Sequence, residues 1–158
     1  MARWKSSSRP PRRGPVAMTG DEDPAQPVNV ADIRLEVAAV AMEVSRIRHA
    51  VVASAEAQGI GPVLRSDIAL AVGEACANVV AHAYPRRATP GPLTVEAYQD
   101  DGVFVVVVSD EGTGIEPQAE SPGRGLGLGL ALIARLARTL EIEPNGHGGA
   151  KLRMAFAE

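Results

Sequence analysis

The stretch GRGLGLGLAL, residues 123–132, decides how the rest of this chain is interpreted. It places glycine on four alternating positions and then continues into an apolar segment with helical spacing. A glycine in a helix costs roughly 0.5–1 kcal/mol relative to alanine, so four of them at a helix start require a reason. Glycine lets a backbone approach an anion closely, and a helix N-terminus offers free N–H groups. The segment is a candidate phosphate site, although tight packing turns have the same pattern.

Two common nucleotide motifs are absent from the chain. The phosphate loop GxxxxGK[ST] needs a Gly-Lys pair, and the sequence contains none. The dinucleotide motif GxGxxG needs a third glycine, but Leu128 and Leu130 occupy the two positions that it would take. The glycines of residues 123–129 therefore belong to neither of these two motifs.

Composition limits the class of protein. A chain of 158 residues fits one domain, and its core must be aliphatic because hydrophobic residues make up 46% and aromatic residues only 3%. The net charge of −3 gives no general attraction to nucleic acid or to a membrane. The single cysteine, Cys76, has no partner for an internal disulfide, and no apolar run approaches the ~20 residues of a membrane span. These features predict a cytoplasmic protein.

The first 27 residues differ from the rest. Residues 1–27 are rich in Pro, Ser, Arg and Gly and lack periodic hydrophobic positions, which predicts a disordered tail. Five basic side chains outnumber three acidic ones there, so the segment is either a solvated tail or a partner-binding arm. Met18 is an alternative start that would remove the basic stretch. Residues 28–158 are predicted to form the folded domain.

The domain alternates between helical and extended patterns. Strands are expected over 29–40, 91–100, 102–110, 140–145 and 149–157, and helices over 41–59, 65–85 and 127–141. Ser66 or Asp67 is expected to cap the second helix. Leu128, Leu132, Ile133 and Leu136 are expected to face inward from the third. The predicted fold class is α+β: a two-layer sandwich with a mixed, mostly antiparallel sheet and helices on one face.

A carboxylate ends the most apolar predicted strand, VVVVSDEGTG. Asp110 at a buried strand end is costly unless it meets a donor, and an adenine amino group is one such donor. Gly112 and Gly114 leave space for a flat base. An ordinary Asp-Gly turn after a strand is the alternative.

The helix GEACANVVAHAY places polar groups on one face, because Glu74, Asn78 and His82 recur every four residues. A carboxylate and a carboxamide one turn apart suit a hard cation such as Mg²⁺ and a polarised nucleophile. The alternative is a solvated helix face, and His82 by itself is more simply explained as a structural or capping residue.

The order of these three segments resembles the GHKL ATPase superfamily, in which ATP sits on an α/β sandwich of the Bergerat type. The helix around Asn78 is similar to the superfamily's N box, DEGTG to its first glycine box and GRGLG to its second. LAVGEACANVVAHAY and GRGLGLGLALIARLA resemble the small anti-sigma factors with serine kinase activity, the RsbW-like proteins. Gly129 departs from the pattern, which usually has a better helix former there, and is expected to loosen the first turn.

The resemblance implies a set of roles. Asn78 would hold Mg²⁺ on the ATP phosphates, Glu74 would act as general base toward a protein serine, and Asp110 would accept a hydrogen bond from the adenine amine. Arg124 would contact the γ-phosphate. The remaining implied nucleotide-binding residues are Gly112, Gly114, Gly123, Gly125, Leu126 and Gly127.

Three functional hypotheses follow from this resemblance. The first is an anti-sigma factor with ATP-dependent protein serine/threonine kinase activity, which phosphorylates an anti-sigma factor antagonist and sequesters a sigma factor, with a homodimer as an expected assembly. The second is a non-catalytic ATP-binding interaction module. The third is a regulator that has lost ATP binding. The intact glycine set and Glu74 favour the first.

Overall fold

The computed structural model describes residues 32–113 and 126–158, the side chain of Leu126 excepted. The tail predicted over residues 1–27 lies outside these ranges. No helix within them is long and apolar enough to cross a membrane.

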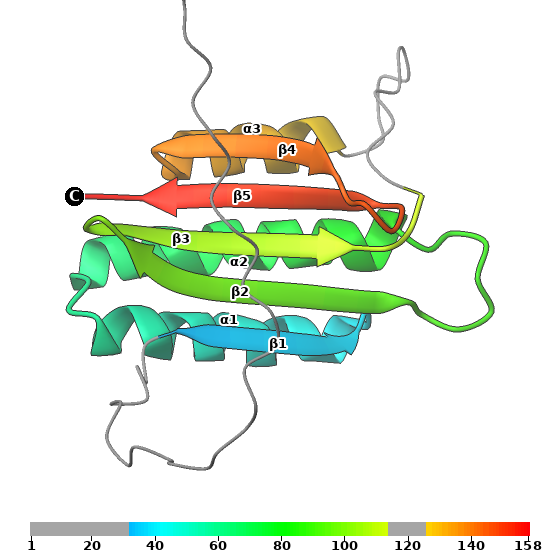
Figure 1. Cartoon of the computed structure of the whole chain (residues 1–158), viewed down its shortest axis with the longest axis horizontal. Coiled ribbons are helices and arrows are strands. Elements are labelled where there is room, and N and C mark those ends of the chain that lie inside the picture. The colour runs from blue at the N-terminus through cyan, green and yellow to red at the C-terminus, as the bar shows by residue number, and fades with distance from the viewer. Residues whose placement is uncertain (1–31, 114–125) are drawn as a thin grey trace, which may run out of the picture.

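The described strands form one five-stranded sheet with the order β1-β2-β3-β5-β4 (Figure 1). Each strand pairs antiparallel with its neighbours, so the expectation of a mixed sheet was wrong for these strands. Strands β2–β3 and β4–β5 are hairpins, as the Asp-Gly and Asn-Gly turn residues predict. The strands are β1 (Ile33–Ala38), β2 (Pro92–Asp100), β3 (Val103–Asp110), β4 (Thr139–Pro144) and β5 (Ala150–Phe156).

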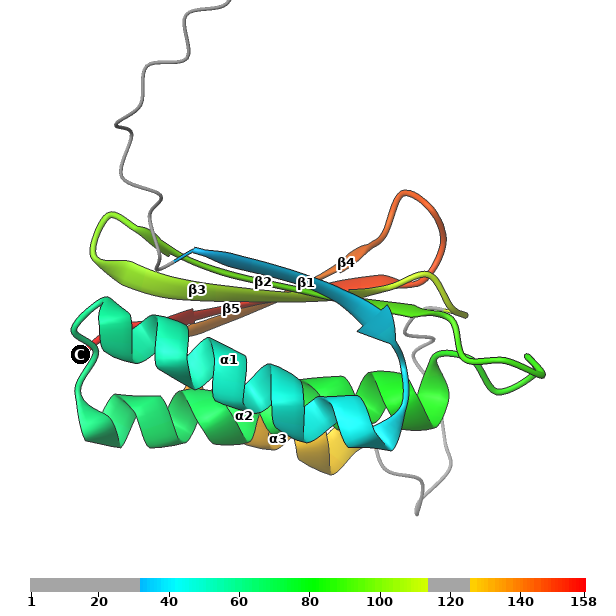
Figure 2. The ribbon, with the colours of Figure 1, turned by 90° about the horizontal axis from the view of Figure 1, so that it is seen from below.

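Three described helices cover a single face of this sheet (Figure 2). They are α1 (Ala41–Ala57), α2 (Pro62–His82) and α3 (Leu126–Leu136). Helix α2 packs against both of the other helices, so it lies at the centre of the helical layer. The two-layer α+β sandwich predicted from the sequence is confirmed.

The core lies between the two layers. The alternation along β3 turns Phe104, Val106 and Val108 toward the helices, where all three are buried. From the helical side Ile47 and Val72 are fully buried in the same cluster. Each such side chain contributes about 1.5–3 kcal/mol relative to exposure. This aliphatic core fixes the position of α2 above β3, which is what brings the candidate site residues together.

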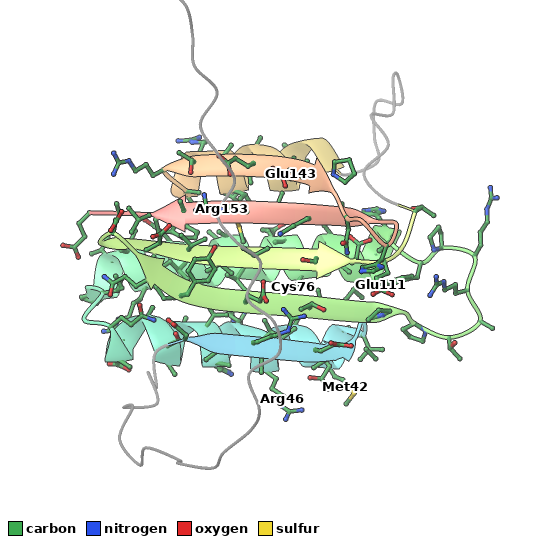
Figure 3. All side chains as sticks on the ribbon, viewed as in Figure 1. Met42, Arg46, Cys76, Glu111, Glu143 and Arg153 are labelled. Carbon is green, nitrogen blue, oxygen red and sulfur yellow. The ribbon has the colours of Figure 1, made fainter. Side chains whose placement is uncertain are left out.

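The other face of the sheet carries charge pairs around a small apolar centre. Val105 and Val107 are buried on that face without a covering helix. Arg34 pairs with Glu96 on one side, and the Arg153 guanidinium lies 3.4 Å from the Glu141 carboxylate on the other. Arg153 extends over the front of the sheet in Figure 3. A hydrogen bond with Tyr98 is the main cause that raises the pKa of Arg153.

Two element boundaries differ from the sequence predictions. Helix α2 begins at Pro62 with Gly61 before it, and Ser66 lies inside the helix, where its hydroxyl donates to the Pro62 carbonyl at 3.0 Å. Proline is favoured at the first helical position because its missing N–H is not needed there. The expected cap at Ser66 or Asp67 was therefore wrong.

Helix α3 ends at Leu136, earlier than predicted, because the chain turns into the sheet. The Arg138 N–H donates to the Ala155 carbonyl at 2.8 Å, and Thr139 then pairs with Ala155. Ile133 is fully buried as expected, but Leu128 is 85% exposed and was wrongly predicted to face inward.

Candidate nucleotide-binding site

A cavity opens between the two layers at the C-terminal end of α2. Its polar lining comes from Asn78 and His82 on α2 and from Asp110 at the end of β3. His82, which the sequence analysis explained as a structural or capping residue, thus borders the site. The remaining lining is apolar: Ala75, Val79, Ala83, Val108, Leu130, Ala150 and Leu152. The alanine side chains are small and leave the cavity open. The arrangement suits a flat, largely apolar ligand with one polar edge.

Asp110 is the buried acidic group of this cavity. Only 7% of the residue is exposed, and its Oδ1 accepts a hydrogen bond from the Gly112 N–H at 2.9 Å. Burial raises the pKa of Asp110, while hydrogen bonds from the Gly112 and Ala150 amides act in the opposite direction. A ligand that donates a hydrogen bond to this carboxylate would stabilise its charged form.

Two glycines allow the backbone to close around Asp110. A Cβ on Gly112 would lie 1.9 Å from the Ala83 carbonyl oxygen, so the segment after β3 touches the end of α2 directly. The Thr113 N–H donates to that same carbonyl at 2.9 Å. Gly149 has φ +77°, and a Cβ there would lie 2.2 Å from the Asp110 carbonyl oxygen. Sequence reasoning explained Gly112 by space for a base, but the space is taken by helix α2.

Tyr84 is a site residue that sequence reasoning missed. Its hydroxyl donates to the Pro92 carbonyl at the start of β2 and accepts from the Glu111 N–H at 2.8 Å. Burial raises the pKa of Tyr84. A signal was available in the composition, because the whole chain has two tyrosines and this one lies at the end of the predicted polar helix.

Asn145 supports Asp110 from the opposite side. Its Nδ2 donates to the Asp110 carbonyl oxygen at 2.8 Å, which joins the turn between β4 and β5 to the end of β3. The sequence predicted this turn only as a hairpin. The end of the cavity that contains Asp110 is therefore held by the end of α2 on one side and by the β4–β5 turn on the other.

Glu74 and Asn78 lie side by side under helix α3. A Cβ on Gly129 would be 3.2 Å from both the Glu74 Oε2 and the Asn78 Nδ2. Gly129 is buried and remains within the helix, so it allows α3 to approach the polar face of α2 closely. This common contact agrees with the four-residue spacing, which puts both side chains on one face of α2.

The comparisons with known proteins agree with this geometry. A model described as the histidine kinase-like ATPase domain matches residues 24–156. This chain belongs to that family. Its predicted relation to the GHKL superfamily is thereby confirmed, and the family match shows a kinase-like, ATP-binding domain.

Individual relatives add detail on the fold. The histidine protein kinase DivJ of Caulobacter vibrioides is 35% identical over 86 residues, which are 46% of this chain and 13% of DivJ. A solved structure titled as the RsbU and RsbW domains of a Mycobacterium tuberculosis protein matches with a TM-score of 0.62 and 21% identity, over 80% of this chain and 32% of that one.

A second solved structure shares the same fold. The histidine kinase domain of a blue-light activated kinase from Erythrobacter litoralis has a TM-score of 0.50 and 19% identity, over 72% of this chain and 60% of that one. This ATPase-family chain therefore spans between 13% and 60% of the length of these three proteins, and the likeness to the solved structures shows the fold alone.

Part of the predicted phosphate end lies beyond the described residues of this ATPase-family domain. Gly123, Arg124 and Gly125 fall in residues 114–125, as does Gly114, which was predicted to leave space for the base. Leu126 is the first residue of α3, and a Cβ on Gly127 would have no heavy atom of the described residues within 4 Å.

The donor set of the cavity fits ATP and a hard cation. The Asn78 Nδ2 is buried and has no hydrogen-bond partner among the described residues, so this carboxamide is free to turn either polar atom toward a ligand. The crowded backbone at Gly112 and Gly149 encloses Asp110 at one end of the mostly apolar cavity. Asn78 lines the same cavity as Asp110, and its carboxamide oxygen is a ligand of the kind that a hard cation takes.

Proposed function

We propose that this chain is an ATP-dependent protein serine/threonine kinase that acts as an anti-sigma factor. In this proposal it phosphorylates an anti-sigma factor antagonist and sequesters a sigma factor, with a homodimer as its assembly. The carrying observation is the pair Glu74 and Asn78, whose polar atoms both lie 3.2 Å from the place where a Cβ on Gly129 would stand. The fold likeness to a structure that includes an RsbW domain supports the same assignment.

In this proposal different residues of the site bind different parts of the ATP molecule. Asp110 accepts a hydrogen bond from the adenine amino group, and the apolar lining covers the faces of the base. Asn78 holds Mg²⁺, which supplies charge neutralisation on the phosphates. Backbone amides at the start of α3, with Gly127 among them, face the phosphate charge because a helix N-terminus favours anions.

Glu74 is the proposed general base. Its carboxylate takes the proton of a serine or threonine hydroxyl on the partner protein, and the hydroxyl oxygen then forms a bond to the γ-phosphorus. The bond from that phosphorus to the bridging oxygen breaks, and ADP leaves. Phosphoryl transfer of this kind depends mainly on positioning and charge neutralisation, so one carboxylate beside the metal-holding Asn78 is a sufficient set of protein groups.

Transfer of labelled phosphate from γ-labelled ATP to a purified antagonist-type protein tests the proposal. Replacing Glu74 with Gln keeps the size of the side chain and is expected to lower the transfer rate by about 10²–10⁴-fold, the usual contribution of a general base. The control is Glu36→Gln, because Glu36 is exposed on the uncovered face of β1. Equal transfer by Glu74→Gln and wild type would remove Glu74 from the mechanism.

A second function has one specific observation in its favour. Glu74 is not among the described residues that line the cavity, so the slot proposed for the base is formed without it. A non-catalytic ATP-binding interaction module would keep Asn78 and Asp110 and use the nucleotide only to set its shape. Tight ATP binding without transfer to any antagonist, with the Glu74→Gln protein binding ATP as wild type does, would favour this module over the kinase.

A further inference from the structure

Three separate segments meet at the hydroxyl of Tyr84. The residue follows the C-terminal end of α2, its hydroxyl donates to the first residue of β2, and it accepts from the segment after β3. Figure 3 shows Glu111, the donor residue, at the end of β3 beside the loop that joins α2 to β2. These contacts lie directly next to Asp110 and outside the cavity itself.

Consecutive amides after Asp110 are each engaged. The Glu111 N–H donates to the Tyr84 hydroxyl, the Gly112 N–H to the Asp110 carboxylate and the Thr113 N–H to the Ala83 carbonyl. Two of these acceptors belong to neighbouring residues at the end of α2. The turn that orients the Asp110 carboxylate is therefore anchored on both sides of its central amide, and one of the two anchors is a side chain.

The ring of Tyr84 has little freedom to move its hydroxyl. A Cβ on Gly91 would lie 2.2 Å from the ring, so the backbone at Gly91 presses against one edge. The Arg87 guanidinium carbon lies 5.1 Å from the ring centroid, close enough for a cation–π contact. The position of the hydroxyl is thus set by packing, which makes it a rigid support for the Glu111 amide.

We propose that Tyr84 is a positioning residue, which fixes the direction of the Asp110 carboxylate and thereby sets the preference of the site for a base with an exocyclic amino group. This inference rests on the proposed adenine role of Asp110. Tyr84 touches no reacting atom in this proposal. Its hydroxyl acts through the Glu111 and Gly112 amides, because loss of the first anchor frees the turn that carries the second.

The test compares two tyrosine variants. Tyr84→Phe keeps the ring packing and removes only the hydroxyl, while Tyr98→Phe removes the other tyrosine hydroxyl, which is bonded to Arg153 on the opposite face of the sheet. Dissociation constants are measured for ATP and for inosine triphosphate, which has a carbonyl in place of the amino group. Wild type is expected to prefer ATP, because inosine presents a carbonyl oxygen where adenine presents the amino donor, and that oxygen would face the carboxylate.

Tyr84→Phe is expected to weaken ATP binding by about 3- to 10-fold, the range of one lost hydrogen bond, and to leave the affinity for inosine triphosphate within about 2-fold of wild type. Tyr98→Phe is expected to leave both affinities unchanged. An equal loss for both nucleotides in Tyr84→Phe would show a merely structural role and would overturn the proposal, as would an unchanged preference.

Amide hydrogen exchange gives an independent readout without nucleotide. The Glu111 and Gly112 amides are expected to exchange at least about 10-fold faster in Tyr84→Phe, while the core amide of Val106 keeps its rate. Unchanged exchange at Glu111 and Gly112 would overturn the positioning role. If wild type binds no ATP, the proposed function fails, and the exchange rates still decide whether Tyr84 orders the segment after Asp110.

Discussion

The end of β3 and the start of α3 both carry glycines of the predicted nucleotide boxes, but the two regions differ in their surroundings. A Cβ on Gly112 would collide with the Ala83 carbonyl oxygen at 1.9 Å, whereas a Cβ on Gly127 would have no heavy atom within 4 Å. The first region is crowded in the protein by itself. In the second, nothing that the structure describes explains why the residue at 127 lacks a side chain.

The difference separates two reasons for glycine in a binding motif. At Gly112 the requirement comes from packing, because the segment after Asp110 must lie against α2. At Gly127 a side chain would stabilise the helix, since alanine is favoured over glycine by about 0.8–1 kcal/mol in a helix interior. Among the described residues no contact requires glycine there, and the proposed phosphate contact would supply a reason.

The largest expected effect is on stability at the crowded end. Gly112→Ala places a methyl group against backbone atoms that cannot move aside, and we expect a loss of roughly 2–4 kcal/mol in the free energy of unfolding. For a chain of this size that corresponds to a fall in Tm on the order of 4–16 °C. Thermal or urea unfolding followed by circular dichroism measures the change.

Gly146→Ala is the matched control for this crowding. Gly146 lies in the β4–β5 turn near the same site, but a Cβ there would have no heavy atom within 4 Å. Its free energy of unfolding is expected to stay within about 0.5 kcal/mol of wild type. Similar losses for the two variants would mean that glycine flexibility, and not the contact with Ala83, is what the end of β3 requires.

Asp110 shows that the crowded end is not organised for stability alone. Burial raises its pKa above the ordinary value of 3.8, so the folded state holds a proton on this group more tightly than the unfolded state does. The contribution of Asp110 to the free energy of unfolding is fully present below pH 3.8. It is lost as the pH rises through the raised pKa. At neutral pH the buried charge of Asp110 therefore lowers the free energy of unfolding, and an uncharged side chain at this position would not have that effect.

Asp110→Asn is accordingly expected to be more stable than wild type at pH 7, by a Tm rise on the order of 2–4 °C, and to bind ATP about 10-fold or more weakly. The stability gain should shrink as the pH falls from 7 toward 4. Asp100→Asn, at the exposed end of β2, is the control and should show neither effect. A variant that loses both ATP binding and stability at pH 7 would mean that the carboxylate is a structural acceptor.

The fold was predictable from this sequence because its patterns are local. The alternation of Phe104, Val106 and Val108, the Asp101–Gly102 turn and the four-residue spacing of Glu74 and Asn78 each report on neighbouring positions. The start of α2 was missed because Pro62 suits a first helical position as well as it suits a loop. The exposure of Leu128 was missed because helical periodicity gives a stripe but not the angle at which the helix docks.

The supports of the site could not be predicted because they depend on contacts across the fold. Tyr84 meets Glu111 from 27 positions away, and Asn145 meets Asp110 from 35 positions away. A single sequence carries no spacing rule for such pairs. The crowding at Gly149 likewise depends on how the β4–β5 turn closes over Asp110, so the sequence indicated a hairpin there but not a wall of the cavity.

A substitution at the start of α3 is expected to change stability little, and it tests the comparison between the end of β3 and the start of α3 most directly. Gly127→Ala adds a helix-favouring methyl in open space, so the free energy of unfolding should rise by about 0.5 kcal/mol, or at least not fall. ATP affinity, measured by isothermal titration, should nevertheless fall several-fold if the backbone there approaches the phosphates.

Gly129→Ala, two residues further along, separates this backbone effect from a side-chain effect. Its methyl would lie 3.2 Å from Glu74 and Asn78, so the helical gain is offset by displacement of two flexible side chains and the stability should change little. We expect phosphoryl transfer to fall more than ATP affinity in this variant, because Glu74 is not needed for recognition. If Gly127→Ala leaves ATP affinity unchanged, the start of α3 has no phosphate contact at that residue, and the distinction between packing and ligand glycines fails at Gly127.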